Sequence, residues 1–296
     1  MDTVKLSNGL DIPSIAYGSA IVDRYRYWSD SKKSQIKYYV KNYINDRNQY
    51  KKDIGIKNIL RKENEQMLID TSRAYGGSEN IIGQCADEKS IVCTKICNKD
   101  QINNSVELGF NKSLDALNRT VIDILLLHWP VENKYIDTWR IMESLYKKGK
   151  VKAIGVCNCN IHHLEEIKRE CEIVPMINQF ECHPLFTQNE LRQYCKENNI
   201  KVMAYTATAR MDDRLKNTIL PEIARNYGKS MTQIIIRWHI QLGNIPIINT
   251  SSYRHYVENK DVFDFELTQA DVERISKINI NSRLRYDPEN CDFNKL

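Results

Sequence analysis

Four polar residues in the first half of the chain stand at or just after the ends of short apolar runs. They are Asp70, at the end of Met67–Asp70; Tyr75, on the loop that follows; Lys95, at the end of Ile91–Lys95; and His128, at the end of Ile122–His128. The carboxyl ends of neighbouring parallel barrel strands meet at one opening. We therefore expect these four side chains to converge at a single site.

Their chemistry suits proton donation by Tyr75. A free phenol has a pKa of about 10, which is too high for an efficient acid at neutral pH. A lysine ammonium about 4 Å away favours the phenolate by roughly 4 kcal/mol at an effective dielectric constant of about 20. We expect Lys95 to lower the pKa of Tyr75 in this way, with Asp70 holding Lys95 charged and in place. A neutral His128 would donate a hydrogen bond to a substrate carbonyl and orient it.

A tyrosine acid needs a hydride donor or another reductant to complete a reaction, and a second group of residues suggests one. Asn158, Gln179 and Tyr205 each stand at or just after the end of a later apolar run, and Asn178 precedes Gln179. Amides offer both hydrogen-bond donors and acceptors, and an aromatic ring offers a stacking surface. Such a group would suit a nicotinamide ring and its carboxamide.

The elements that position these residues follow a regular rhythm, in which short apolar, β-branched runs alternate with longer amphipathic segments. The predicted strands are Ile15–Gly18, Met67–Asp70, Ile91–Lys95, Ile122–His128, Ala153–Cys157, Met176–Gln179, Val202–Tyr205 and Ile245–Ile248. The predicted helices include Thr138–Lys148, His162–Glu170, Gln188–Asn198 and Met231–Leu242. Eight strands alternating with helices predict an α/β fold, the (β/α)8 TIM barrel. A doubly wound open sheet is the alternative, disfavoured because no GxGxxG motif follows the first strand.

Two segments fall outside this rhythm. Val4–Ile12 alternates apolar residues around an Asn-Gly pair, so we expect an N-terminal β-hairpin that plugs one end of the barrel. Ile21–Asp53 is polar and rich in Tyr and Lys, and we interpret it as a long insertion between the first strand and a helix over Ile54–Glu65. A loop at the carboxyl end of a barrel strand lies on the active-site face, so this insertion could shape or cover a substrate pocket. Its candidate aromatic residues are Tyr25, Tyr27 and Trp28.

The length fits a single barrel domain over residues 1–296, and it would also fit two domains of about 150 residues each, so the strand rhythm rather than the length favours one barrel. The net charge is only +5, with Lys and Arg scattered among Asp and Glu, which indicates a solvated surface rather than a nucleic-acid footprint. No apolar run approaches the roughly 18 residues that a membrane span requires, and no signal-peptide pattern begins the chain. The nine cysteines show neither a CxxC pair nor zinc-site spacing, so we expect reduced thiols in a cytoplasmic protein.

Several motifs, in order along nearly the whole chain, resemble the aldo-keto reductase family. They are Ile69-Asp70-Thr71 with Tyr75-Gly76, Thr94-Lys95, Leu127-His128-Trp129-Pro130, Gly149–Val156, Asn178–Pro184 and Asp261–Leu267. The resemblance implies a catalytic tetrad of Asp70, Tyr75, Lys95 and His128. It also implies hydride transfer from NADPH to an aldehyde or ketone, while Tyr75 protonates the developing alkoxide.

The resemblance further implies where the cofactor binds. Asn158 and Gln179 would hold the nicotinamide carboxamide, and Tyr205 would stack on the ring. The cofactor channel would be lined by residues that follow other strands, namely Gly18, Ser19, Thr206, Asn249, Thr250, Ser251, Arg254, His255, Glu258 and Asn259. Trp129 would wall the substrate pocket, with core packing as the alternative. In this family the dinucleotide lies across the barrel mouth without a separate nucleotide-binding domain, which agrees with the missing glycine motif.

Two departures from the family pattern lie near the nicotinamide and the pyrophosphate. Cys157 stands where a serine often precedes the asparagine at Asn158. After Tyr205 the chain reads Thr206–Arg210 in place of Ser-Pro-Leu-Gly. Arg210 thereby becomes a candidate contact for the pyrophosphate.

A third departure concerns the adenosine 2′-phosphate. Asn249–Ser252 resembles the family's Gly-Thr-Ser variant, and His255, with Arg254 beside it, stands where an arginine often lies. A neutral histidine is a weaker phosphate partner than an arginine fork. We expect NADP(H) in preference to NAD(H), which remains the alternative.

Other functional classes fit the residues less well. A non-catalytic barrel that keeps a nicotinamide site for a regulatory or structural purpose is the main alternative, and the intact tetrad disfavours it. A metal-dependent hydrolase is disfavoured because Asp70 and His128 have no second histidine at a strand end to complete a ligand set. The sequence therefore predicts a carbonyl reductase that acts on a small molecule without a metal.

Overall fold

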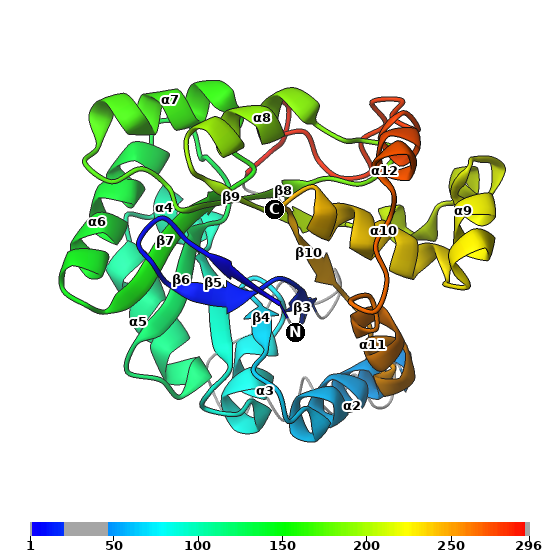
Figure 1. The fold of residues 1–296 in the computed structure, drawn as a ribbon. Helices are drawn as coiled ribbons and strands as arrows, with labels where there is room; N and C mark the ends of the chain where they lie inside the picture. The colour runs from blue at the N-terminus through cyan, green and yellow to red at the C-terminus, as the bar shows by residue number, and fades with distance from the viewer. Residues whose placement is uncertain (1, 21–46, 294–296) are drawn as a thin grey trace.

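The computed structural model describes residues 2–20 and 47–293. Within them, eight parallel strands close into a barrel in the order β10-β3-β4-β5-β6-β7-β8-β9 (Figure 1). The barrel strands are β3 Ala16–Gly18, β4 Leu68–Asp70, β5 Ile91–Ile96, β6 Ile122–Leu127, β7 Val151–Cys157, β8 Ile177–Glu181, β9 Lys201–Tyr205 and β10 Ile245–Ile248. The predicted barrel is confirmed, and the open-sheet alternative is wrong. His128 is the first residue after β6 rather than its last.

The helices surround the barrel (Figure 1). The α-helices are α2 Arg47–Lys62, α3 Ser78–Cys85, α4 Asn98–Ile102, α5 Val106–Leu117, α6 Tyr135–Lys147, α7 Ile161–Glu170, α8 Asn189–Glu197, α9 Leu220–Tyr227, α10 Met231–Gln241, α11 Tyr253–Lys260 and α12 Gln269–Ser276, and two 3-10 turns are η1 Ala209–Met211 and η2 Asp213–Asn217. Because α2 begins at Arg47 rather than Ile54, the last residues of the predicted insertion are helical. Tyr25, Tyr27 and Trp28 lie outside the described residues. Across the described part of the chain, no helix combines the length and apolarity needed to cross a membrane.

The N-terminal hairpin closes one end of the barrel. Strands β1 Thr3–Lys5 and β2 Asp11–Pro13 pair antiparallel, and Gly9 turns the chain with a φ of 88° that suits glycine. The Asn8 amide donates to the Lys152 carbonyl at 2.8 Å, at the amino end of β7. The hairpin therefore covers the amino ends of the strands, as predicted, and in Figure 1 it crosses the front of the barrel.

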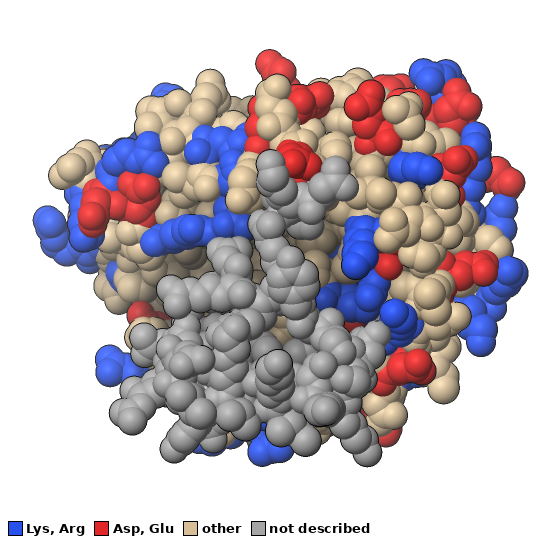
Figure 2. Space-filling view, turned by 180° about the vertical axis from the view of Figure 1, so that it is seen from behind, with Lys and Arg blue, Asp and Glu red and all other residues tan. Residues whose placement is uncertain are grey.

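The barrel core leaves the opposite end for chemistry. Strands β5 and β6 are buried at every position, which suits the continuous apolar runs of parallel strands covered on both faces. Gly155 lets β7 approach β8 closely, because a Cβ there would lie 2.6 Å from the Ile177 carbonyl oxygen. We call the end at which the carboxyl ends of the strands lie the mouth. Figure 2 looks onto this face, where Lys and Arg side chains gather on both sides of the middle.

Candidate active site

A buried ion pair forms the base of the site. Asp70 ends β4 and Lys95 lies on the neighbouring β5, and their side chains are almost fully buried. Lys95 Nζ donates to Asp70 Oδ1 at 2.7 Å and to the Thr71 carbonyl at 2.7 Å. Burial alone would lower the pKa of Lys95, but the charge of Asp70, together with smaller contributions from Tyr75, Cys157 and Cys93, outweighs it, and the pKa stands well above its usual value. Lys95 is therefore a fixed cation at the mouth.

Tyr75 lies on the loop between β4 and α3. Its backbone N–H donates to the Ser72 carbonyl at 2.9 Å, which closes a turn. Gly77 follows with a φ of 86°, a left-handed conformation that lets the chain reverse into α3. Arg73 pairs with Asp100 on α4 and so ties the loop to the barrel rim.

The predicted tetrad meets at the mouth. Lys95 Nζ lies 4.8 Å from the centre of the Tyr75 ring. The His128 ring lies 5.7 Å from the same ring at 77°, an edge-on arrangement. Asp70, Tyr75, Lys95 and His128 thus surround one point, although their sequence positions are spread over 59 residues from 70 to 128.

Burial controls the pKa of Tyr75. Removal of the phenolate from water raises this pKa above its usual value, Lys95 lowers it in part, and Asp70 raises it again. The expectation that Lys95 brings the pKa below that of a free phenol is therefore wrong for this structure, because the desolvation of the phenolate exceeds the attraction of the ammonium. The phenol keeps its proton at neutral pH, so it is available as a donor.

His128 is neutral over the physiological range. Burial, and then the Lys95 charge, lowers its pKa to about 3. Its carbonyl accepts a hydrogen bond of 3.0 Å from the Asn158 amide. A neutral imidazole that lies half-buried at the mouth can donate one ring N–H to a ligand.

The amide group predicted for a nicotinamide lies beside the tetrad. The Tyr205 hydroxyl donates to Asn158 Oδ1 at 2.7 Å, and Gln179 Nε2 donates to Asp70 Oδ1 at 2.7 Å. Asn178 alternates to the other side of β8 and donates to the Cys159 carbonyl at 2.8 Å, so it does not join this group. Asn158 and Gln179 are therefore hydrogen-bonded directly to tetrad residues, and Tyr205 is joined to the tetrad through Asn158.

Two segments predicted to line the cofactor channel differ in burial: the one after β3 is buried, and the one after β9 ends in an exposed arginine. Gly18 ends β3, and the Ser19 hydroxyl that follows is fully buried and donates to the Asp70 carbonyl at 3.0 Å. The loop after β9 bends at Thr206, with a φ of 53°. Arg210 then lies exposed on η1, with no side-chain partner among the described residues.

The residues predicted near the adenosine end lie where β10 leads into α11. The Ser252 hydroxyl accepts from the His255 N–H at 3.4 Å and caps the helix, and Arg254 and His255 are exposed in its first turn. Along the same segment the structure places Asn249, Thr250 and Ser251 before the cap and Glu258 and Asn259 in the last turns. A helix N-terminus attracts anions, so this segment could receive a phosphate.

A comparison with known proteins agrees with this geometry. The sequence profile described as "Aldo/keto reductase family" matches residues 41–280. The chain belongs to the aldo/keto reductase family. As a member, it is an NAD(P)H-dependent oxidoreductase.

Relatives of this aldo/keto reductase cover most of its length. It is 37% identical to the glyoxal reductase of Bacillus subtilis over 297 residues, covering 99% of this chain and 98% of the relative. It is 34% identical to methylglyoxal reductase DkgA of Salmonella typhimurium over 229 residues, covering 75% and 82% of the two chains. Its fold is similar to that of a Bombyx mori aldo-keto reductase solved in complex with NADP, with a TM-score of 0.81, 26% identity and coverage of 97% and 96%.

Trp129 connects the tetrad to the end of the reductase chain. It is 7% exposed, and its ring lies 6.5 Å from that of His128 and 6.4 Å from that of Phe293. We call residues 279–293 the C-terminal tail. Trp129 therefore separates His128 from the last described residue of this tail.

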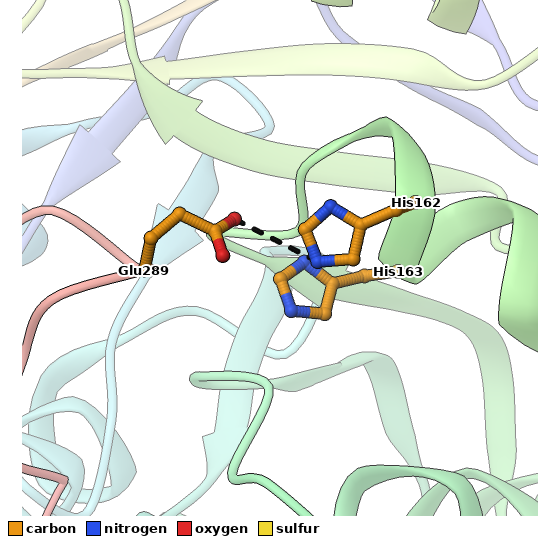
Figure 3. A group of neighbouring side chains, drawn as sticks. All are labelled: His162, His163 and Glu289. Atoms are coloured by element: carbon orange, nitrogen blue, oxygen red, sulfur yellow. Dashed lines mark ion pairs between the residues drawn. The ribbon is translucent and has the colours of Figure 1, made fainter.

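Sequence reasoning missed the residues that attach the C-terminal tail. Glu181, which lies within the Asn178–Pro184 motif, accepts two backbone N–H groups of the tail. At a second place, His162, His163 and Glu289 bring three ligand-type atoms within 4.8 Å of one another (Figure 3). His163 Nδ1 already accepts from the Asn160 N–H at 3.1 Å, and the Asn160 amide donates to Glu289. We assign this cluster to tail attachment, since Asn160 already bonds His163 Nδ1 and one oxygen of Glu289.

Proposed function

We propose that this aldo/keto reductase transfers a hydride from NADPH to the carbonyl carbon of a small aldehyde or ketone, with Tyr75 as the proton donor. The single observation that carries the proposal is the buried Lys95–Asp70 pair beneath the Tyr75 ring, with His128 at the ring's edge. The balanced reaction takes one aldehyde, one NADPH and one proton to one primary alcohol and one NADP⁺.

The residues of the tetrad would act on the carbonyl oxygen. Tyr75 gives its phenolic proton to the oxygen as negative charge develops there. Lys95 stabilises the phenolate that remains, and Asp70 keeps Lys95 charged and oriented. When bound, the nicotinamide supplies the hydride. His128, held neutral, donates a hydrogen bond that orients the carbonyl beside Tyr75.

The donor set beside the tetrad fits a nicotinamide. Asn158 and Gln179 provide amide donors and acceptors for its carboxamide, and the half-buried Tyr205 provides a ring surface. The hydrogen bonds from Tyr205 to Asn158 and from Gln179 to Asp70 hold these side chains in place beside the tetrad, where a carboxamide could bind them. Gly18, Ser19 and Thr206 would border the same channel, and Arg210 would contact the pyrophosphate.

A preference for NADPH is supported by the start of α11. Arg254 and His255 present exposed basic side chains at a helix N-terminus, where a 2′-phosphate would be favoured. The Bombyx mori relative was solved with NADP. We infer that Arg254 provides the charge that His255 lacks when neutral.

The substrate class we propose is a small 2-oxoaldehyde. Relatives named glyoxal reductase and methylglyoxal reductase support it. Trp129 would form an apolar wall next to His128. Such a wall suits a compact carbonyl compound better than a charged one.

The experiment is NADPH consumption with methylglyoxal, by wild type and Tyr75→Phe. Removal of the acid should reduce kcat by about 10²–10⁴-fold, while fluorescence titration should give an unchanged Kd for NADPH. Tyr227→Phe is the matched control, since its hydroxyl bonds Asp271 on α12, away from the mouth. Undiminished turnover in Tyr75→Phe would refute the proposed acid. NADPH binding without turnover on any of a broad panel of carbonyls would favour the non-catalytic alternative.

A further inference from the structure

Glu181 carries a fully buried carboxylate that the reaction proposed above does not use. It ends β8 directly beside Tyr205 of β9, in register across the sheet. Its oxygens accept from the Leu284 N–H at 2.7 Å and from the Arg285 N–H at 3.0 Å, and His183 Nε2 lies 3.0 Å away. A buried carboxylate is unfavourable unless such donors satisfy it. Two of these donors come from the C-terminal tail, more than 100 residues later in the chain.

The tail is attached again further along. At Glu289 its carboxylate accepts from the Asn160 amide and lies 3.7 Å from His162 Nε2, at the start of α7 (Figure 3). At its end, the Phe293 carbonyl accepts from the Asn98 amide at 3.3 Å. The tail thus touches, in turn, the segments that follow β8, β7 and β5, all at the mouth.

These attachments differ in strength. The Glu289 contact is exposed, with 45% of that side chain accessible, so water and salt weaken it. The Phe293 contact is a single hydrogen bond from the Asn98 side-chain amide, together with packing of the Phe293 ring on Trp129. Of these three contacts, the one at Glu181 combines a charged acceptor, two backbone donors and complete burial. Hydrogen bonds to a charged acceptor are strong, and burial shields them from water.

We propose that Glu181 is a positioning residue whose carboxylate clasps the C-terminal tail, so that Phe293 stays packed on Trp129 next to His128. The effect on catalysis rests on the proposed reductase function. The clasp itself is a statement about the tail and can be measured without turnover.

The test is Glu181→Gln. The amide keeps one acceptor oxygen but turns an NH₂ donor toward the other backbone N–H, so one of the two bonds is lost. We expect Trp129 to become more accessible to acrylamide, measured as quenching of tryptophan fluorescence. The share of Trp129 is the part of the quenching that is absent when Trp129→Phe is introduced. We also expect KM for methylglyoxal to rise about 10-fold while kcat changes less than about 3-fold, with the Kd for NADPH unchanged. Glu181→Asp, which keeps both acceptor oxygens, should restore part of the change.

Glu143→Gln is the matched control. Glu143 on α6 is also a buried carboxylate that accepts two backbone N–H groups, from Glu172 at 2.9 Å and Ile173 at 2.6 Å, but it does not contact the tail. Both N–H groups bond the same oxygen, Oε1, so the glutamine amide can keep both bonds while the buried charge is removed. The KM and the Trp129 quenching of this variant should stay at the wild-type values.

The outcomes separate the alternatives. If folded Glu181→Gln matches Glu143→Gln in both KM and Trp129 quenching, Glu181 is a structural residue only and the proposal is overturned. If Glu181→Gln does not fold, Phe293→Ala replaces it: a similar rise in KM supports the clasp, and an unchanged KM overturns it. Increased quenching in a protein whose wild type reduces no carbonyl would uphold the clasp and reject the reductase function.

Discussion

At the scale of single residues, the site depends on a balance between burial and charge. Lys95 is buried, yet it stays charged because Asp70 lies 2.7 Å away. Tyr75 is raised in pKa by the same burial, and the ammonium recovers only part of that shift. The tyrosine therefore keeps its proton at neutral pH and is available as the proposed donor. In the proposed reaction, Lys95 would stabilise the phenolate after proton transfer rather than ionise the phenol of the free enzyme.

The neutrality of His128 leads to a prediction about pH. Because its pKa is about 3, this side chain does not change charge between pH 5 and pH 8. We expect His128→Gln, which keeps a neutral donor, to retain about ten times more activity than His128→Ala. We also expect the pH profile of kcat/KM to show no rise near pH 6.5 that is present in the wild type and absent in the glutamine variant. The appearance of such a rise would mean that His128 titrates in the free enzyme.

At the scale of elements, several loops after barrel strands each contribute one part of the candidate site. The loop after β4 carries Tyr75, the one after β9 carries Arg210, and the one after β10 leads into α11. These loops are irregular in sequence, but the strands before them pair with both neighbours in the closed barrel. The mouth thus collects residues from distant positions because strand ends in a parallel barrel share one edge.

The start of α11 supports a prediction about cofactor choice. Arg254→Leu should weaken NADPH binding about 10-fold, equivalent to about 1.4 kcal/mol, because one charged contact to the 2′-phosphate is lost. NADH binding should not change. Fluorescence titration with both cofactors measures this, and Arg225→Leu, at an exposed arginine in α9, provides the comparison. An equal loss for both cofactors would place Arg254 on another part of the dinucleotide.

At the scale of the whole molecule, buried histidines couple stability to pH. Burial lowers the pKa of His239 to about 3, and that of His163 to about 4. The unfolded chain takes up protons on these rings below about pH 6.5, whereas the folded chain does not until about pH 3 to 4. The unfolded state therefore binds more protons in this window, and stability falls as the pH decreases through it.

We expect the free energy of unfolding to drop by about 2 kcal/mol for each fully buried histidine between pH 7.5 and pH 5. Urea unfolding at the two pH values measures it. His239→Gln should remove about one histidine's share of the change, although it also loses the bond to the Ala207 carbonyl. His255→Gln, at an exposed position, should keep the wild-type dependence. A slope that is identical in all three proteins would contradict this account.

Much of this protein could be predicted from local patterns. Apolar runs such as Ile122–Leu127 have to be buried, and their alternation with amphipathic segments allows few folds other than the barrel. Polar residues at the ends of such runs, including Asp70 and Lys95, have to meet at the mouth because parallel strands point the same way. The sequence by itself therefore determined the fold and which polar side chains lie together at the mouth; their catalytic and cofactor-binding roles stay predictions.

Other features were decided only by the tertiary structure. Whether burial or the ammonium controls the pKa of Tyr75 depends on how much water the packed loops exclude. The clasp between Glu181 and the backbone of Leu284 and Arg285 joins groups that no local pattern relates, and backbone N–H groups carry no sequence signal. Such long-range contacts arise because a buried charge has to find donors wherever the fold brings them.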